Sequence, residues 1–410
     1  MFIQIHMLQS MPPGNLNRDD TGQPKKCLFG GVTRGRISSQ CLKRNIRHSA
    51  QFKDTFGDAL AIRTVYLPRM VADALKDDDI DDSDLDKIKK ALGRKFKSEK
   101  TKGEDDQDGD DSSGDDTSST SEADKTGQLV FIPPPFAKEI ASLITDFKGK
   151  NQEAYKQWCA GEKSKKAEEK KAIENLEKEI FKASHLLSVD IALFGRMTTS
   201  DLVVNVEAAC QVAHAISTHE TLIESDYFTA MDEKKVEYAL TQTDATGAGF
   251  LGSGETETFF NSSVYYKYFN IDIDAFQKHL SWDAKKTADA VGAFVRAAAL
   301  ANPTGKQNSF AAHGVPELIL VEVSEKKQPI SYANAFLQPV KGSNLMAGSA
   351  LALAEYVNSV ATAFVTNDMC RCLLVVGSAT EAKIDDAQFV KKLDDLVACV
   401  TDTLKSKVAV

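Results

Sequence analysis

One segment restricts the fold of this chain more than any other, because it cannot be part of a hydrophobic core. Residues 99–127 consist mainly of Asp, Ser, Thr and Gly and contain no aromatic residue. A segment of this composition cannot bury enough apolar surface to offset the entropy lost on ordering. We therefore expect a solvated, disordered insertion, with the folded part of the chain built from sequence on both sides. A regulatory segment that mimics nucleic acid is the alternative interpretation.

Because of this acidic segment, the net charge of the chain does not describe the charge of its other parts. The formal net charge is −9 at pH 7, but ten acidic residues lie between Glu104 and Asp124, so the remainder is close to neutral. Residues 21–53, in contrast, contain eight Lys and Arg residues and neither Asp nor Glu. Because local charge rather than net charge decides where a polyanion binds, residues 21–53 are the candidate nucleic-acid-binding segment.

The order of apolar patterns predicts an α+β fold. Strands are predicted at 2–8, near 187–194, at 263–271 and at 318–323, and helices at 39–52 and 284–301. In chain order these elements give βαββαβ, the ferredoxin-like arrangement that RNA recognition motifs share. Long insertions would interrupt this motif after the first helix and again before the third strand.

Composition predicts the character of the intervening segments. Residues 59–98 and 148–187 are rich in charged residues and predicted to be helical, and residues 205–219 are predicted to form another helix. Residues 241–258 are rich in Gly, Ser and Thr around one apolar pair, Phe250-Leu251. The glycines give this stretch the backbone freedom of a protruding hairpin.

The first predicted helix carries the most informative side chains. Ser38-Ser39 is expected to cap its N-terminus, and Leu42 and Ile46 can pack inward. Its opposite face, at the spacing i, i+3, i+4 and i+7, carries Gln40, Lys43, Arg44 and Arg47. Cations beside the free amides of a helix N-terminus form a phosphate-binding surface. An ordinary solvated basic face is the alternative interpretation.

Recognition of bases is not expected at this surface. The aromatic pattern by which RNA recognition motifs stack bases is missing from the sequence. Binding should therefore be made through phosphates and be largely indifferent to base sequence.

One grouping, Asn17-Arg18-Asp19-Asp20, could support catalysis. Paired carboxylates beside a basic loop could hold Mg²⁺ for phosphodiester cleavage. The alternative is that the two Asp side chains cap turns and orient Arg18. A two-metal site needs further acids, and residues 21–53 supply none. We therefore predict that the chain is not an enzyme.

No cofactor, metal site or membrane anchor is predicted. The seven cysteines are dispersed without a CxxC pair, and His214 and His219 are five residues apart, which separates them on a helix. Dispersed cysteines in a chain without a signal peptide fit a reducing cytoplasm. No apolar run approaches the length of a membrane span, so a soluble, cytoplasmic protein is expected.

Several stretches are similar, in order, to one known family: the CasC family of backbone subunits of the type I-E Cascade complex. This is the multi-copy protein that coats the CRISPR guide RNA. The similar stretches are Leu16–Asp20, Phe29–Gly31, Arg36–Gln40, Leu42–Arg44, Val189–Leu193, Gly195–Met197, Ala213–His219, Asp226–Ala230 and Ser331–Phe336. The acidic insertion departs from the family pattern, and the last 60 or so residues carry none of its motifs.

The resemblance implies a protein shaped like a hand. Its palm, with the RNA recognition fold, would comprise residues 1–58, 212–225 and 261–410. A helical finger domain would comprise residues 59–211, including the acidic insertion, and a thumb hairpin would comprise residues 226–260.

The resemblance also implies site residues and partners. The phosphate-binding residues would be Arg18, Lys25, Arg36, Ser38, Gln40, Lys43, Arg44 and Arg47. Met197 would lie in a loop that presses against the bases, and Phe250 and Leu251 at the thumb tip would cover a kinked nucleotide. The implied partners are CRISPR guide RNA, the target DNA strand paired to it, further copies of the chain head to tail, and other Cascade subunits.

Two other functions stay open from the residues. One is a metal-dependent ribonuclease on the same fold that uses Asp19 or Asp20. The other is a single-strand-binding protein unconnected to CRISPR, whose affinity would be electrostatic and strongly salt-dependent.

Overall fold

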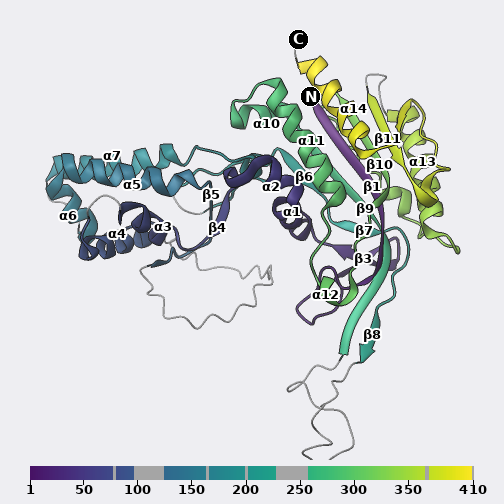
Figure 1. Ribbon diagram of the computed structural model, residues 1–410, viewed down its shortest axis with the longest axis horizontal. Coiled ribbons are helices and arrows are strands. Elements are labelled where there is room, and N and C mark those ends of the chain that lie inside the picture. The colour runs from purple at the N-terminus through teal and green to yellow at the C-terminus, as the bar shows by residue number, and fades with distance from the viewer. Residues whose placement is uncertain are drawn as a thin grey trace, which may run out of the picture. The chain divides into compact units, whose positions relative to one another are not determined.

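The computed structural model describes residues 1–76, 80–96, 124–162, 166–198, 202–227, 257–364 and 369–408 (Figure 1). The chain divides into two compact units. We call them the sheet unit (Met1–Gln51, Val212–Asn270 and Val291–Val410) and the helical unit (Phe52–Gln211 and Ile271–Ala290). Most of the acidic insertion and the tip of the expected thumb, with Phe250 and Leu251, lie outside the described residues.

The described residues form a ten-stranded, mostly antiparallel sheet with the order β12-β11-β10-β1-β9-β7-β3-β2, and β6 and β8 also pair with β9 (Figure 1). The strands are β1 (Phe2–Gly14), β2 (Lys26–Phe29), β3 (Val32–Ile37), β6 (Cys210–Val212), β7 (Ala215–Ser217), β8 (Glu224–Tyr227), β9 (Glu257–Asp272), β10 (Pro316–Ser324), β11 (Cys370–Val375) and β12 (Ala387–Val390). The strands predicted at 2–8, 263–271 and 318–323 are confirmed as parts of β1, β9 and β10. The mixed α+β class is confirmed as well.

The central strands are covered on both faces. On one face Tyr266 of β9 and Leu320 of β10 pack under α13 (Leu345–Phe364) and η4 (Tyr332–Phe336). Successive side chains of a strand point to opposite faces, so Phe269 lies on the other face, where its ring meets Phe294 of α11 (Ala284–Leu300) edge-on. In the described part of the chain, the central strands therefore leave no open face for stacked bases.

The far side of α11 packs against the C-terminal helix. Gly292 of α11 lies against Val397 and Thr401 of α14 (Leu393–Val408). The remaining short elements of this unit are α12 (Gln307–Phe310) and η5 (Gly377–Ala379). A disulfide between Cys372 and Cys399 joins β11 to α14, a pairing of which the dispersed cysteines gave no sign.

A buried polar network fixes the Ser331–Phe336 stretch against the sheet. The Tyr332 hydroxyl donates to the two carboxylate oxygens of Glu322 at 3.1 and 3.0 Å, and Arg371 Nε donates to the same group at 2.9 Å. His6 Nε2 lies 3.3 Å from it. Burial alone would raise the pKa of Glu322, but His6 and Arg371 hold it below its ordinary value. This stretch is therefore part of the core.

The helical unit surrounds a core of its own. Its main elements are η1 (Gly57–Ala59), α3 (Leu67–Leu75), α4 (Asp82–Lys95), α5 (Pro135–Lys150), α6 (Gln152–Ala160), α7 (Ala167–Ala183), α8 (Val189–Phe194), α10 (Ile273–Leu280) and the paired strands β4 (Ile62–Thr64) and β5 (Val130–Ile132). Helix α7 buries Leu176 and Ile180 and leaves most of its charged side chains in solvent. Among the described residues, none of the helices combines the length and apolar character that a bilayer crossing requires.

Two predictions of local structure are wrong. The strand predicted near 187–194 is helix α8, in which every residue is buried. A short, mostly apolar run, interrupted here by Asp190, carries no periodicity that separates a buried helix from a strand. The helix predicted at 205–219 contains strands β6 and β7 instead, because β7 pairs with both β3 and β9 and this pairing overrides local preference.

The first helix is also shorter than predicted. Helix α1 (Ser39–His48) ends at Ser49, and a separate helix α2 (Ala50–Phe56) follows. Its predicted N-cap and its inward-facing Leu42 and Ile46 are confirmed.

A matched pair of glycines at the β2–β3 turn tests this part of the fold. Gly30 and Gly31 both have positive φ, at +61° and +81°. An added Cβ at Gly30 would overlap the carbonyl oxygen of Leu337, whereas one at Gly31 would meet open space. We expect Gly30→Ala to lower the free energy of unfolding by about 3 kcal/mol, and Gly31→Ala by about 1 kcal/mol. Chemical denaturation measures both, and equal losses would contradict the packing of Gly30 on Leu337.

Candidate nucleic-acid interface

The first turn of α1 is the centre of the candidate interface. Ser38 lies outside the helix with extended backbone, and its hydroxyl accepts a hydrogen bond from the amide of Cys41 at 3.3 Å. The first turn contains no acidic residue. Its positive dipole end is therefore not neutralised from within the helix.

A loop of residues 17–25 is tied to this turn. The Asn17 side-chain oxygen accepts the Ser38 amide at 2.8 Å, and the Asn17 carbonyl accepts the Lys25 amide at 2.8 Å. Arg18 forms an isolated β-bridge with Pro24, which closes the loop. These contacts bring exposed Arg18 and partly buried Lys25 to the start of α1.

Asp19 closes the turn within that loop. One of its carboxylate oxygens accepts the Thr21 amide at 3.0 Å, the Thr21 hydroxyl at 2.8 Å and the Gln23 amide at 3.0 Å. Burial alone would raise the pKa of Asp19, but these hydrogen bonds hold it below its ordinary value. The described residues contain no cluster of three or more His, Cys, Asp or Glu side chains that could hold a metal ion.

Two arginines of strand β3 have different environments. Arg36 is partly buried, and its guanidinium lies 3.1 Å from His214 Nδ1 and 3.4 Å from the carbonyl of Lys26. Arg34 is fully buried and donates to the carbonyls of Phe29, Ser217 and Phe336 at 3.1, 3.1 and 2.7 Å. Arg36 therefore remains partly exposed beside the candidate interface, while Arg34 joins the β2–β3 hairpin to the core.

Most of the expected phosphate-binding residues come together around α1. We call this set the basic surface: Arg18, Lys25, Arg36, Gln40, Lys43 and Arg44. The Ser38 hydroxyl is buried and occupied by the helix cap. Arg47 lies on the same helix face by spacing, but its side chain is only 7% exposed and has interactions of its own. The covering of the last turn of α1 was not predicted.

Sequence reasoning missed one cation beneath this surface. Lys267 lies in β9, and its side chain is fully buried near Cys41 in the first turn of α1. The available signal was a lysine between two tyrosines in a strongly apolar strand. Because charged residues are almost never fully buried unless they are paired, a lysine at such a position indicates a partner that the sequence does not identify.

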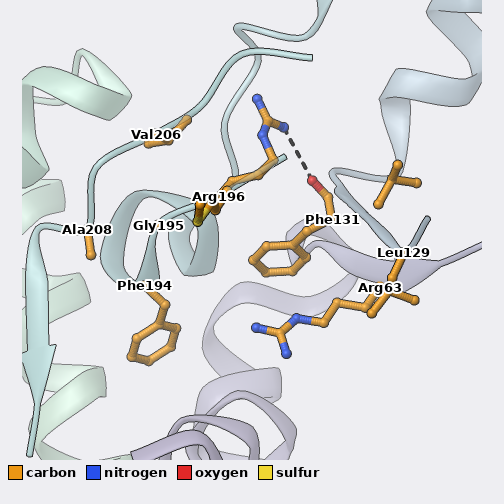
Figure 2. A pocket seen from close by; sticks show the side chains of 10 residues that line it. Arg63, Leu129, Phe131, Phe194, Gly195, Arg196, Val206 and Ala208 are labelled. Atoms are coloured by element: carbon orange, nitrogen blue, oxygen red, sulfur yellow. Dashed lines mark hydrogen bonds between the residues drawn. The ribbon is translucent and has the colours of Figure 1, made fainter. Parts of the chain in front are cut away.

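In the helical unit, Met197 follows Arg196, whose side chain is held in place by hydrogen bonds. Arg196 is buried and donates to the carbonyls of Ser184, Val204 and Phe131 at 2.6, 2.9 and 3.3 Å, the last drawn in Figure 2. Burial lowers the pKa of Arg196 to about 10. The side chain of Met197, by contrast, is 92% exposed.

A cavity of about 410 Å³ lies beside this loop (Figure 2). Its lining includes Met197, Leu129 and Phe131, and the Arg63 guanidinium lies 5.0 Å from the centre of the Phe131 ring. Apolar side chains and a cation stacked on an aromatic ring can contact an unpaired base. The implied position of Met197 against the bases stays a prediction.

The chain is similar to solved structures over nearly its whole length. One is a chain described as "CRISPR RNA-guided surveillance complex, pre-nicking", with a TM-score of 0.74 and 27% identity. Another, described as "CRISPR RNA-guided surveillance complex", has a TM-score of 0.67 and 22% identity, which shows the shared fold alone. Each match covers 98% of this chain and 100% of the other.

The family is shown by a separate comparison. No curated protein sequence matches the chain. The model of one protein family matches residues 3–399, which is nearly the entire sequence. The chain therefore belongs to the CT1975-like protein family of Cas proteins.

Proposed function

We propose that this chain is a structural, non-catalytic subunit of a CRISPR surveillance complex that binds guide RNA through its phosphates. The observation that carries the proposal is the basic surface, in which the 17–25 loop, β3 and α1 present cations around a helix N-terminus. Membership of a Cas family and similarity to surveillance-complex chains support it.

The covered faces of the sheet support binding through phosphates rather than through bases. In an RNA recognition motif, bases stack on aromatic side chains of an open sheet face. Here Tyr266 and its neighbours are buried beneath α13 and η4. A subunit that ignores base sequence can serve guides of any sequence.

We further propose that the sheet unit contains a ferredoxin-like palm. The order β10-β1-β9-β7 is that of a βαββαβ sheet, with α1 before β7 and α11 between β9 and β10 in the chain. In this proposal β7 takes the place of the strand predicted at 187–194. The helical unit would be the finger domain, and the antiparallel pairing of β8 with β9, from Glu224↔Phe260 to Tyr227↔Glu257, would be the base of the thumb.

The ribonuclease alternative is not favoured. The Asp19 carboxylate already accepts three hydrogen bonds within its own loop, and Asp20 is exposed to solvent. We propose instead that the subunit holds the guide for pairing with a target DNA strand, alongside other Cascade subunits.

Copies of the chain are proposed to stack head to tail along the guide. A subunit that binds phosphates has no register except the one its neighbour imposes, and a heterologous contact that does not close gives an open filament. We therefore expect the number of copies per complex to rise in whole-subunit steps as the guide is lengthened. Native mass spectrometry on guides that differ by several nucleotides measures this, and a fixed copy number would mean a closed ring instead.

A further inference from the structure

Lys267 is a buried cation without a hydrogen-bonding partner among the described residues. Its neighbours Tyr266 and Tyr268 point to the face of the sheet covered by α13, so Lys267 points to the opposite face, toward α1. Its side chain is 0% exposed, and its Nζ makes no hydrogen bond to any described residue. A buried ammonium in this condition loses its hydration without compensation.

Three other buried cations among the described residues have partners in the fold: Arg34, Arg196 and Arg371 hydrogen-bond to carbonyl or carboxylate oxygens. Arg34 and Arg196 each donate to three carbonyl oxygens. Arg371 pairs with the carboxylate of Glu322 at 2.9 Å. The three arginines avoid the cost of an uncompensated buried charge, whereas Lys267 bears it, and this points to a partner that is absent from the free chain.

The position of Lys267 indicates where that partner binds. Lys267 lies near Cys41, in the first turn of α1, and Arg44 and Lys25 also lie near Cys41. Cations from β9, from α1 and from the 17–25 loop therefore lie near one helical turn that contains no acidic residue. The charged groups of the sheet's other face, Glu322 among them, lie on the opposite side of β9.

We propose that Lys267 is a positioning residue that draws an RNA phosphate onto the first turn of α1. It acts from beneath the helix through short-range electrostatic attraction, not by contact, since its side chain is not accessible. The proposal rests on the proposed function and adds to it a residue outside the basic surface and a dependence on pH.

The dependence on pH follows from the burial of Lys267. Burial lowers its pKa to about 8, while burial raises the pKa of the Cys41 thiol to about 11, so the thiol stays neutral through the relevant range. A bound phosphate favours the charged ammonium and raises the pKa of Lys267. Its contribution to binding is therefore fully present below pH 8 and is lost as pH rises through the pKa of the complex.

The test compares the wild-type chain with Lys267→Met and Lys267→Arg. Each binds a short labelled oligoadenylate, whose bases do not titrate here, at fixed salt between pH 7 and pH 9.5. We expect wild-type affinity to fall about fivefold or more across this range. Lys267→Met should be weaker by a similar factor at pH 7 and independent of pH. Lys267→Arg should bind tightly and also be independent of pH, because arginine stays charged.

Calorimetry and stability measurements distinguish the proposed positioning role of Lys267 from a merely structural role. Wild-type chain should take up a fraction of a proton on binding RNA at pH 8.5, seen as a heat that depends on the buffer, and Lys267→Met should not. Lys267→Met removes a buried charge, so its melting temperature should not fall. If Lys267→Met binds RNA as wild type does, with the same pH profile, this proposal is wrong. If the wild-type chain itself fails to bind RNA, the proposed function is wrong.

Discussion

Replacing Lys25 and Arg44 together by alanine will weaken binding of single-stranded RNA about tenfold to hundredfold, equally for all RNA sequences. Both cations flank the first turn of α1, from the 17–25 loop and from the helix itself. A variant that neutralises fewer phosphates also releases fewer counterions when it binds, so the slope of log affinity against log salt should fall by about 0.7 per residue. Fluorescence anisotropy at several salt concentrations measures both quantities.

A charge-matched control distinguishes this from a general loss of positive charge. Lys391 and Lys392 are exposed and follow β12, at the opposite edge of the sheet from β2. Lys391→Ala with Lys392→Ala should leave the affinity and the salt slope close to those of wild type. Equal weakening by both double variants would mean that RNA binding follows net charge, and the basic surface would lose its role.

The largest loss of stability is expected from Arg34→Ala. This side chain is fully buried, and its removal leaves the carbonyls of Phe29, Ser217 and Phe336 without their donors. Unsatisfied buried acceptors cost about 1–3 kcal/mol each, so a loss of about 4 kcal/mol in the free energy of unfolding is expected. For a unit of this size, that lowers the melting temperature by about 10 °C.

Arg36 provides the matched comparison within the same strand. Its guanidinium is partly exposed and bonds to His214 and to the carbonyl of Lys26. Arg36→Ala should lower the melting temperature by no more than a few degrees and weaken RNA binding. Thermal unfolding followed by circular dichroism tests the pair, and a stable Arg34→Ala would show that the hairpin is held by other contacts.

Local patterns in the sequence were sufficient for several elements. Alternation in residues 2–8, and short runs of aromatic and aliphatic residues at 263–271 and 318–323, predicted three strands of the sheet, because residues of these types favour strands. The cap at Ser38 and the apolar edge of α1 were also predicted, since both depend on residues within one or two turns. Charge segregation located the basic surface for the same reason: it is a property of a continuous segment.

The elements that were predicted wrongly lack such a local signal. The run Val189–Phe194 is apolar on nearly every side, and only its burial within the helical unit makes it a helix. Strand β7 is three residues long, and its extended form comes from pairing with β3 and β9, which lie far away in the sequence. No window around either segment contains the information that decided its structure.

Whether each cation of the candidate site is buried or exposed was likewise decided by tertiary structure. Sequence determined that Arg34, Arg36 and Arg47 belong to one basic, acid-free segment. Only the fold decided that Arg34 is buried among carbonyls, that Arg36 reaches the surface and that Arg47 is covered. Only the fold placed Lys267 beneath α1, more than 200 residues away along the chain. Charge is set by residue type, but burial depends on which distant elements pack over a side chain, and burial decides whether a cation stabilises the core or remains available to bind RNA.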